Sequence, residues 1–313
     1  MAMIISVIVP TYRRPKDLAR CLEGLSLQSR LANEVFAVVR NTDSETWSFF
    51  NSFNLNLPNL HLLTVEIAGV VAAMNVGLDA AKGDIVAFID DDAVPHANWL
   101  FCMEAHFQED SKLGGVGGRD FIYENGILKT GSSEVVGQLQ WFGRMIGNHD
   151  TGIGSPREVD ILKGVNMGFR RVAVGDLRFD KRLLGSGAQV HLEVAFCLSL
   201  KRSGWKIIYD PVLMVDHFRA QRFDEDQRDT FNHIALINST HNYTLALLDH
   251  FSPFRRFVFL VWVLLVGTRE HLGFVQLFRF LPTQGNLSVK KWLASIEGTR
   301  LGYLTWSRNK IQP

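Results

Sequence analysis

Three consecutive carboxylates, Asp90, Asp91 and Asp92, follow the uninterrupted apolar run 85–89. A short apolar run bounded by polar residues predicts a strand buried on both faces of a parallel sheet. In open α/β sheets, ligands bind beyond the carboxyl ends of the strands. Adjacent anions repel one another there, and a divalent cation shared with substrate phosphates would compensate them. The sequence therefore predicts a site for Mg²⁺ or Mn²⁺ at this strand end, with an acidic turn or helix N-cap as the alternative.

The segments that must position this site alternate between strand and helix patterns. Apolar runs predict strands at 4–10, 34–39, 60–65 and 85–89. Helical spacing or composition predicts helices at 17–28 and 69–82. Such alternation with short connections predicts an α/β fold, a doubly wound and mostly parallel sheet with helices on both faces.

Composition fits a globular chain of one large or two moderate domains, with 313 residues, 47% hydrophobic and 21% charged. The net charge of +1 conceals an asymmetry. Residues 1–250 hold 24 Lys and Arg against 30 Asp and Glu, whereas residues 251–313 hold 9 against 2. A basic C-terminal region suggests a polyanionic partner, either nucleic acid or an anionic membrane. Its basic residues are interleaved with long aliphatic runs, which argues against nucleic acid.

The C-terminal region contains two apolar stretches, 257–266 and 272–281, flanked or interrupted by arginines. Each is shorter than the roughly 20 residues that a transmembrane helix needs. A buried packing helix, an interfacial amphipathic helix and a re-entrant hairpin remain open as interpretations. We favour the interfacial helix because the region is basic and rich in Phe, Trp and Leu.

The three cysteines, Cys21, Cys102 and Cys197, are widely spaced in apolar stretches and are predicted to be reduced thiols. The N-terminus lacks the basic segment and long apolar core of a signal peptide. We therefore expect a cytoplasmic protein, peripheral on the inner face of the cell membrane.

Short motifs occur in a fixed order along the chain: 7–12, 73–77, 83–84, 88–92, 164–167, 170–171, 179–180, 208–211 and 215–217. In residue type, order and spacing they resemble family-2 glycosyltransferases of the GT-A fold. The resemblance covers about residues 1–218. It implies a catalytic domain with a nucleotide-sugar-binding half at about 1–95 and an acceptor-binding half at about 96–218. Residues 219–313 would then form a helical, basic and membrane-associating extension.

The same resemblance implies an inverting transfer of sugar from a nucleotide-diphosphate sugar to a lipid-linked or polysaccharide acceptor. Glu193 matches the family's general base, and His191 is the rival base because its ordinary pKa lies nearest neutrality. A Glu in the first turn of a helix is also an ordinary dipole partner, and a lone His after a strand is often structural. The implied metal ligands are Asp90, Asp92 and His217. The implied nucleotide-sugar contacts are Pro10, Thr11, Tyr12, Arg40, Asp43, Asn75, Asp90 and Asp91.

The chain departs from the family pattern at Arg40, Met74 and Leu192. These departures leave open a degenerate transferase that serves as a membrane assembly subunit. Asp90–Val94 also fits a phosphohydrolase of the haloacid-dehalogenase type, although no second acidic pair follows a later apolar strand. A nucleotidyltransferase would need an N-terminal glycine-rich basic loop, and residues 12–16 have the basic residues without the glycines.

Overall fold

The computed structural model describes residues 2–52, 57–228 and 230–308. The chain divides into two compact units. The first comprises Met1–Gln138, Ile146–Phe179 and Phe196–Gln221, and the second Leu139–Met145, Asp180–Ala195 and Arg222–Pro313. The boundary falls within helix α6 (Leu192–Arg202), so the first turn of this helix belongs to the second unit.

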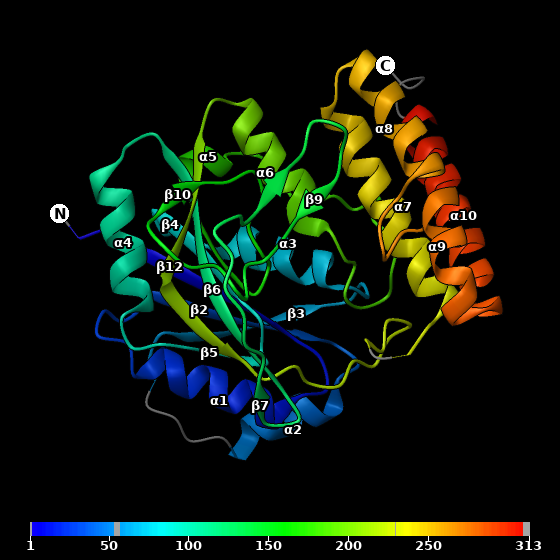
Figure 1. The fold of residues 1–313 in the computed structure, drawn as a ribbon. Coiled ribbons are helices and arrows are strands. Elements are labelled where there is room, and N and C mark those ends of the chain that lie inside the picture. Colours follow the sequence, from blue (N-terminus) through cyan, green and yellow to red (C-terminus); the bar gives the residue numbers. More distant parts are fainter. Residues whose placement is uncertain (1, 53–56, 229, 309–313) are drawn as a thin grey trace. The chain divides into compact units, whose positions relative to one another are not determined.

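The first unit is built on one large sheet, whose N-terminal strands are parallel in the order β3-β2-β1-β4 (Figure 1). These strands are β1 (Ile5–Thr11), β2 (Glu34–Arg40), β3 (Leu60–Val65) and β4 (Ile85–Ile89). They alternate with helices α1 (Pro15–Ser26), α2 (Ser44–Ser52) and α3 (Val70–Ala80). Every residue of β1 and β4 is buried, as expected for strands covered on both faces. The predicted strands and helices of this half are confirmed, and α2 is an additional helix.

The sheet continues beyond β4 in the order β11-β6-β12-β10. Its strands are β5 (Ala93–Pro95), β6 (Leu113–Glu124), β7 (Ile127–Leu128), β10 (Arg157–Glu158), β11 (Asn166–Arg170) and β12 (Lys206–His217), with helices α4 (Trp99–Glu109) and α5 (Arg171–Val174). Strand β11 runs antiparallel to both of its neighbours, whereas β12 is parallel to β6. Strands β8 (Gln138–Leu139) and β9 (Met145–Ile146) form a separate pair. The mixed, mostly parallel architecture with helices on both faces confirms the predicted fold class.

The core of the first unit lies where α4 packs on the sheet. Trp99 is fully buried, and its indole Nε1 donates to Asn166 Oδ1 at 2.8 Å. Asn166 in turn donates to the Leu213 carbonyl at 2.8 Å. These bonds satisfy buried polar groups and join α4, β11 and β12. Cys21 and Cys197 are buried thiols, and Cys102 is a partly buried one.

The second unit contains four helices in its C-terminal part: α7 (His233–His250), α8 (Pro253–Leu265), α9 (Phe274–Gln284) and α10 (Asn286–Arg308). Gly298 and Gly302 let α10 pack closely on α7, because a Cβ at either position would lie under 3 Å from α7 atoms. Within the described residues, no helix combines the length and the hydropathy needed to cross a bilayer.

Candidate metal and nucleotide-sugar site

The acidic triplet lies where the sequence predicts it, immediately after the buried strand β4 (Figure 1). Asp90 is partly buried, whereas Asp91 and Asp92 are 3% and 2% exposed. The Ala93 N–H donates to the Asp90 carbonyl at 3.1 Å, and the chain then enters β5, which pairs with β12. In this register His217 lies opposite Ala93. The end of β12 is therefore placed beside the carboxylates that follow β4.

The charge of Asp91 is compensated by the segment after β1. It accepts hydrogen bonds from Thr11 Oγ1 at 2.8 Å and from Arg14 Nη1 at 2.7 Å. Burial raises the pKa of Asp91 to about 7; the Arg14 guanidinium opposes this shift, and the Asp92 charge adds to it. Burial lowers the pKa of Arg14, but the neighbouring carboxylates outweigh it, so the pKa of Arg14 lies above its ordinary value. Asp91 thus anchors the loop that follows β1.

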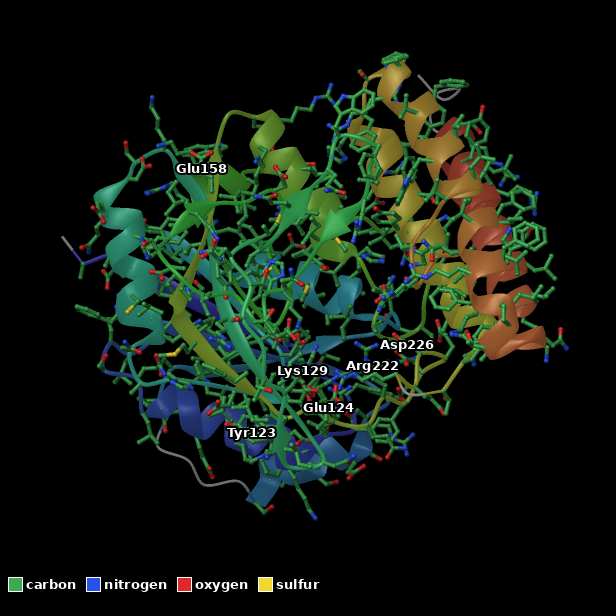
Figure 2. All side chains as sticks on the ribbon, viewed as in Figure 1. Tyr123, Glu124, Lys129, Glu158, Arg222 and Asp226 are labelled. Atoms are coloured by element: carbon green, nitrogen blue, oxygen red, sulfur yellow. The ribbon has the colours of Figure 1, made fainter. Side chains whose placement is uncertain are left out.

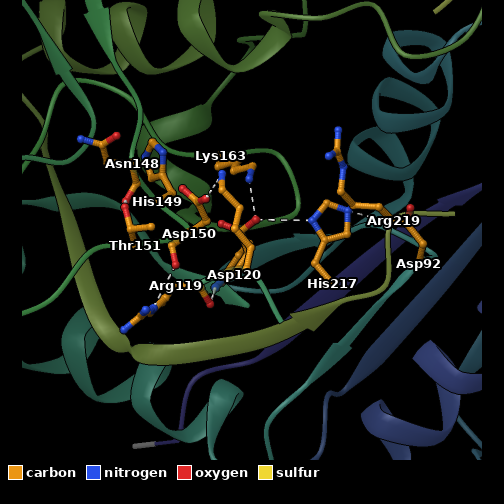
Figure 3. A network of polar contacts seen from close by, with 12 residues as sticks. Asp92, Arg119, Asp120, Asn148, His149, Asp150, Thr151, Lys163, His217 and Arg219 are labelled. Carbon is orange, nitrogen blue, oxygen red and sulfur yellow. Dashed lines mark hydrogen bonds and ion pairs between the residues drawn. The ribbon is translucent and has the colours of Figure 1, made fainter. Parts of the chain in front are cut away.

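Asp92, His217, Asp120 and Lys163 form a buried chain of polar contacts (Figure 3). His217 Nε2 lies 3.3 Å from Asp92 Oδ1, and His217 Nδ1 lies 3.4 Å from Asp120 Oδ2. Lys163 Nζ lies 2.5 Å from the same Asp120 oxygen. The Ala220 N–H holds the other oxygen of Asp92 at 2.9 Å. This chain fixes the direction in which the imidazole presents each of its nitrogens.

The charges in this chain shift one another's protonation. Burial lowers the pKa of His217, but its contacts with Asp120 and Asp92 outweigh burial, so the pKa lies above its ordinary value. Burial raises the pKa of Asp120, but the Lys163 ammonium and His217 outweigh it, so that pKa lies below its ordinary value. Asp120 is therefore an anion that can hold an N–H of the imidazole on one side while Nε2 faces Asp92.

Asp90, Asp92 and His217 can hold a divalent cation. Each offers one ligand atom, and the three atoms lie within 4.8 Å of one another. Two carboxylate oxygens and one imidazole nitrogen suit Mn²⁺ well, and the carboxylates also suit Mg²⁺. Asp120 supplies the carboxylate that usually orients a metal-binding histidine through its second nitrogen. The residues present therefore fit the predicted metal.

The backbone after β12 continues to pack on the end of β6. The Phe218 ring stacks on Tyr123 with centroids 4.9 Å apart, and Arg219 forms an ion pair with Glu124. Tyr123, Glu124 and Lys129 lie together around the β6–β7 hairpin (Figure 2). These contacts fix the segment that follows His217.

Pro10 and Thr11 are the last residues of β1. Three other residues that are predicted to contact the nucleotide sugar, Tyr12, Arg40 and Asp43, lie in or beside the loop that follows. The Arg40 guanidinium lies over the Tyr12 ring, 5.3 Å from its centroid. Asp43 is buried and accepts from the Arg13 N–H at 2.5 Å and from the Thr46 N–H at 3.1 Å. Asp43 therefore caps α2 and ties it to the loop. Tyr12 and Arg40 thus form a cation–π pair beside this loop.

The described side-chain hydrogen bonds of Asn75 are made to residue 179 and not to this loop. Its side-chain amide donates to the Phe179 carbonyl at 2.9 Å and accepts from the Phe179 N–H at the same distance. Asn75 is 5% exposed. The structure thus gives its amide a role in joining α3 to residue 179.

The two predicted base residues belong to the second unit. Glu193 is partly buried in the first turn of α6. His191 is buried, and burial together with the nearby His271 lowers its pKa to about 3. An imidazole with so low a pKa is a weak proton acceptor at neutral pH.

Sequence reasoning missed Arg14, Asp120 and Lys163 as parts of this site. Arg14 has a visible signal, since it follows the motif 7–12 within two residues. Asp120 ends a glycine-rich segment, and Lys163 precedes the motif 164–167, but neither position indicates its partner. The approach of Asp120 to His217 depends on the pairing of β6 with β12, which has a register shift between Asp210 and Met214.

Comparison with known proteins agrees with this geometry. The sequence profile of the family described as "Glycosyl transferase family 2" matches residues 6–178. Glycosyltransferase AglE of Haloferax volcanii is 33% identical over 128 residues, which are 39% of this chain and 41% of AglE. The chain therefore spans less than half the length of that relative.

Two further similarities extend over nearly the whole chain. Amylovoran biosynthesis glycosyltransferase AmsB of Erwinia amylovora is 23% identical, and the alignment covers 97% of this chain and 92% of AmsB. The solved structure of mannosyltransferase PcManGT from Pyrobaculum calidifontis, in complex with GDP-Man and Mn²⁺, superposes with a TM-score of 0.57 at 15% identity. That match covers 97% of this chain and 88% of PcManGT and shows a shared GT-A fold. Since the family profile matches more than half of the residues, the chain belongs to glycosyl transferase family 2.

Proposed function

We propose that the protein transfers a sugar from a nucleotide-diphosphate sugar to an acceptor hydroxyl with inversion at the anomeric carbon. The observation that carries this proposal is the convergence of Asp90, Asp92 and His217 beyond the strand ends. Family membership and the donor and Mn²⁺ bound by PcManGT support it. We further propose a polysaccharide or lipid-linked acceptor; the similarity to AmsB, whose name is amylovoran biosynthesis glycosyltransferase, is the support for a biosynthetic role.

The residues of the first unit would bind the donor's diphosphate. Mg²⁺ or Mn²⁺, when bound, supplies Lewis-acid stabilisation of the negative charge on the departing diphosphate. Asp90, Asp92 and neutral His217 would hold it, and Asp120 keeps the His217 ring in place. Arg14 neutralises Asp91, which lowers the repulsion within the triplet. The Tyr12 ring and Arg40 would contact the nucleoside.

Glu193 is the proposed general base. In the transfer, the acceptor oxygen bonds to the anomeric carbon, the bond from that carbon to the diphosphate oxygen breaks, and the acceptor proton passes to the Glu193 carboxylate. His191 is the weaker choice because its pKa of about 3 leaves it little affinity for a proton. The nucleoside diphosphate leaves with the bonding electron pair.

A pair of variants tests this assignment. In Glu193→Gln we expect sugar transfer to fall about a hundredfold or more, because a general base contributes roughly 10²–10⁴-fold. Its stabilisation against heat by UDP or GDP with Mn²⁺ should persist, because the diphosphate site is intact. In Asp92→Asn both transfer and this stabilisation should be lost. The measurements are nucleoside diphosphate release from a panel of UDP- and GDP-sugars, and thermal unfolding.

The matched control is Asp216→Asn, which removes the neighbouring carboxylate that faces His96 at 3.3 Å. It should keep both properties. Unchanged turnover in Glu193→Gln would remove Glu193 from the mechanism. Mn²⁺-dependent stabilisation in Asp92→Asn equal to that of the parent would contradict the metal site.

We also propose that α8 and α9 dock on an anionic membrane surface, where a lipid-linked acceptor would be presented at its cytoplasmic face. Each helix exposes an apolar stripe at helical spacing, with Phe257 65% and Phe278 67% exposed. The stripes consist of Phe254, Phe257, Val261, Leu264 and Leu265 in α8 and Phe274, Val275, Phe278 and Leu281 in α9. Neither helix contains an acidic residue, and both contain arginine. Exposed apolar side chains flanked by basic ones fit an anionic lipid surface.

Cosedimentation with vesicles tests the docking. The protein should bind phosphatidylglycerol vesicles at low salt, bind them less at high salt, and bind phosphatidylcholine vesicles weakly. Phe257→Ser combined with Phe278→Ser should reduce binding several-fold, whereas Phe101→Ser, which removes an exposed Phe of α4, should not. Absence of binding at low salt would contradict the proposal. A concentration-dependent dimer lost in the double variant would assign the face to a second copy instead.

A further inference from the structure

A buried pair of histidines in the second unit shares one serine hydroxyl. Ser239 Oγ of α7 lies 3.2 Å from His191 Nε2 and 3.1 Å from His271 Nε2. The two imidazole centroids are 5.7 Å apart, and the Tyr243 ring lies 5.2 Å from one and 5.5 Å from the other. His191 and His271 are 6% and 4% exposed. None of these side chains has a role in the proposed transfer so far.

The hydroxyl of Ser239 links the protonation of the two imidazoles. A serine hydroxyl has one proton and two lone pairs, so it can donate to no more than one of the two imidazoles, and at least one ring must donate its Nε2–H to it. The tautomers of the two rings are therefore linked through the shared hydroxyl. Burial lowers the pKa of His271 to about 4, and burial with His271 lowers that of His191 to about 3, so both rings are neutral near pH 7. A neutral, mutually dependent relay holds its members in one arrangement.

The cluster fixes the backbone from which α6 begins. His191 has a φ of +72°, a left-handed conformation that is uncommon for residues other than glycine, although Asn, Asp and His are enriched in it. Its carbonyl accepts the Val194 N–H at 3.1 Å and so closes the first turn, which contains Glu193. The preceding residues are bound to α7 as well, because Asn242 donates to the Leu184 carbonyl at 2.9 Å and to the Val190 carbonyl at 3.1 Å. The hydrogen bond between Ser239 and His191 holds the residue that immediately precedes the first turn of α6.

The third member comes from the connection between α8 and α9. The His271 carbonyl accepts the Thr268 N–H at 2.8 Å, and the next residue, Leu272, donates its N–H to Ser295 Oγ of α10 at 3.0 Å. The connection is thus held on both sides of His271. Through Ser239, the residue that precedes the base-bearing turn is bound to a fixed point of the helical unit.

We propose that the His191–Ser239–His271 relay positions the first turn of α6 and, with it, the Glu193 carboxylate. His191, Ser239 and His271 are then positioning residues for the reaction, not proton carriers. This inference rests on the proposed role of Glu193 as base. It explains why a histidine occupies a left-handed position: its ring supplies a tie to α7 that glycine would lack.

Kinetics of Ser239→Ala test the relay, because this change removes both hydrogen bonds. We expect kcat for sugar transfer to fall about tenfold, since displacing a reacting group by about 1 Å can cost up to roughly a hundredfold. The KM for the nucleotide sugar and the stabilisation by nucleoside diphosphate with Mn²⁺ should stay within about twofold of the parent. His250→Gln is the matched control, because His250 also lies on α7 and its Nδ1 bonds the Ala246 carbonyl of its own helix at 2.8 Å. It should leave kcat unchanged.

A conservative rescue keeps the test decisive should Ser239→Ala unfold. His271→Gln retains a side-chain amide for Ser239 and should recover most of the kcat that His271→Leu loses. His191→Asn, whose backbone tolerates a positive φ, should lose kcat without the backbone change. Wild-type kcat in Ser239→Ala, or equal losses in His271→Gln and His271→Leu, would overturn the relay. Should one of these outcomes occur, Glu193→Gln shows which proposal has failed. A fully active Glu193→Gln would mean that the assignment of Glu193 as base is also wrong, whereas an inactive one would mean that only the relay is wrong.

Discussion

Each unit of the molecule contains a cluster of buried titratable groups, and the two clusters are stabilised in opposite ways. In the first unit, Asp91, Asp92 and Asp120 remain close to Arg14, Lys163 and His217, so buried carboxylates are balanced by buried or partly buried cationic groups. In the second, His191 and His271 share a hydroxyl and are buried as neutral rings. The first arrangement is suited to binding ions, and the second to holding a shape.

The two units also differ in what their basic residues contact. In the first unit, Arg14 and Lys163 form ion pairs with carboxylates of the acidic site. In the second unit, α8 and α9 carry arginines beside exposed aromatic rings and no carboxylates. We infer that the first unit recognises a small charged substrate and the second an extended anionic surface.

The strongest way to break this comparison is to remove one balancing charge from the first unit. In Asp120→Asn, His217 and Lys163 lose their shared anion. We expect Mn²⁺ affinity to fall about tenfold to a hundredfold, because a carboxylate that orients a metal-binding histidine contributes roughly that much. Titration of Mn²⁺ against its electron paramagnetic resonance signal measures the affinity directly.

Asp150→Asn is the matched control in the same network (Figure 3). Asp150 pairs with the exposed Lys129 at 2.6 Å, and exposed ion pairs contribute little. Its Mn²⁺ affinity should equal that of the parent. Equal affinities in Asp120→Asn and Asp150→Asn would mean that the buried chain has no part in holding the metal.

Much of the first unit could be predicted from the sequence because its signals are local. Strands 34–39, 60–65 and 85–89 are apolar runs, and the carboxylates after the last one can only lie at the strand end. His217 also ends an apolar strand, but its place among the metal ligands came from the family resemblance. Local patterns therefore located the two carboxylates of the candidate metal group, and the resemblance supplied the histidine.

The partners of these residues could not be predicted because they depend on long-range register. Asp120 reaches His217 only through the pairing of β6 with β12 and the shift after Asp210. Asn75 and Asp43 fit the family's motif, yet their described hydrogen bonds join backbone segments far apart in sequence or cap α2. The relay around Ser239 combines residues separated by 48 and 32 positions, a distance at which sequence periodicity carries no information.

A smaller effect sharpens the comparison through pH, because the histidines of the two clusters link protonation to stability with opposite signs. His217 has a raised pKa, so the stability it contributes is present in acid and is lost as the pH rises through its folded pKa. His191 and His271 have lowered pKa values of about 3 and 4 against an ordinary 6.5. Their contribution is fully present above pH 6.5 and declines as the pH falls from there towards 4, since the unfolded chain then binds protons that the folded unit refuses.

Replacing one of these rings with a side chain that does not titrate isolates the effect. In His271→Gln, the free energy of unfolding should fall less steeply between pH 6.5 and 5 than in the parent, by up to about 1.4 kcal/mol per pH unit. Denaturant unfolding in the presence of a chelator gives this slope without interference from metal binding at His217. The acid-sensitive background from buried His149, whose pKa is lowered to about 4, is common to both proteins and cancels. Parallel slopes for parent and variant would show that His271 binds protons equally in the folded and unfolded chains, and the second unit would then not hold this ring in a neutral state.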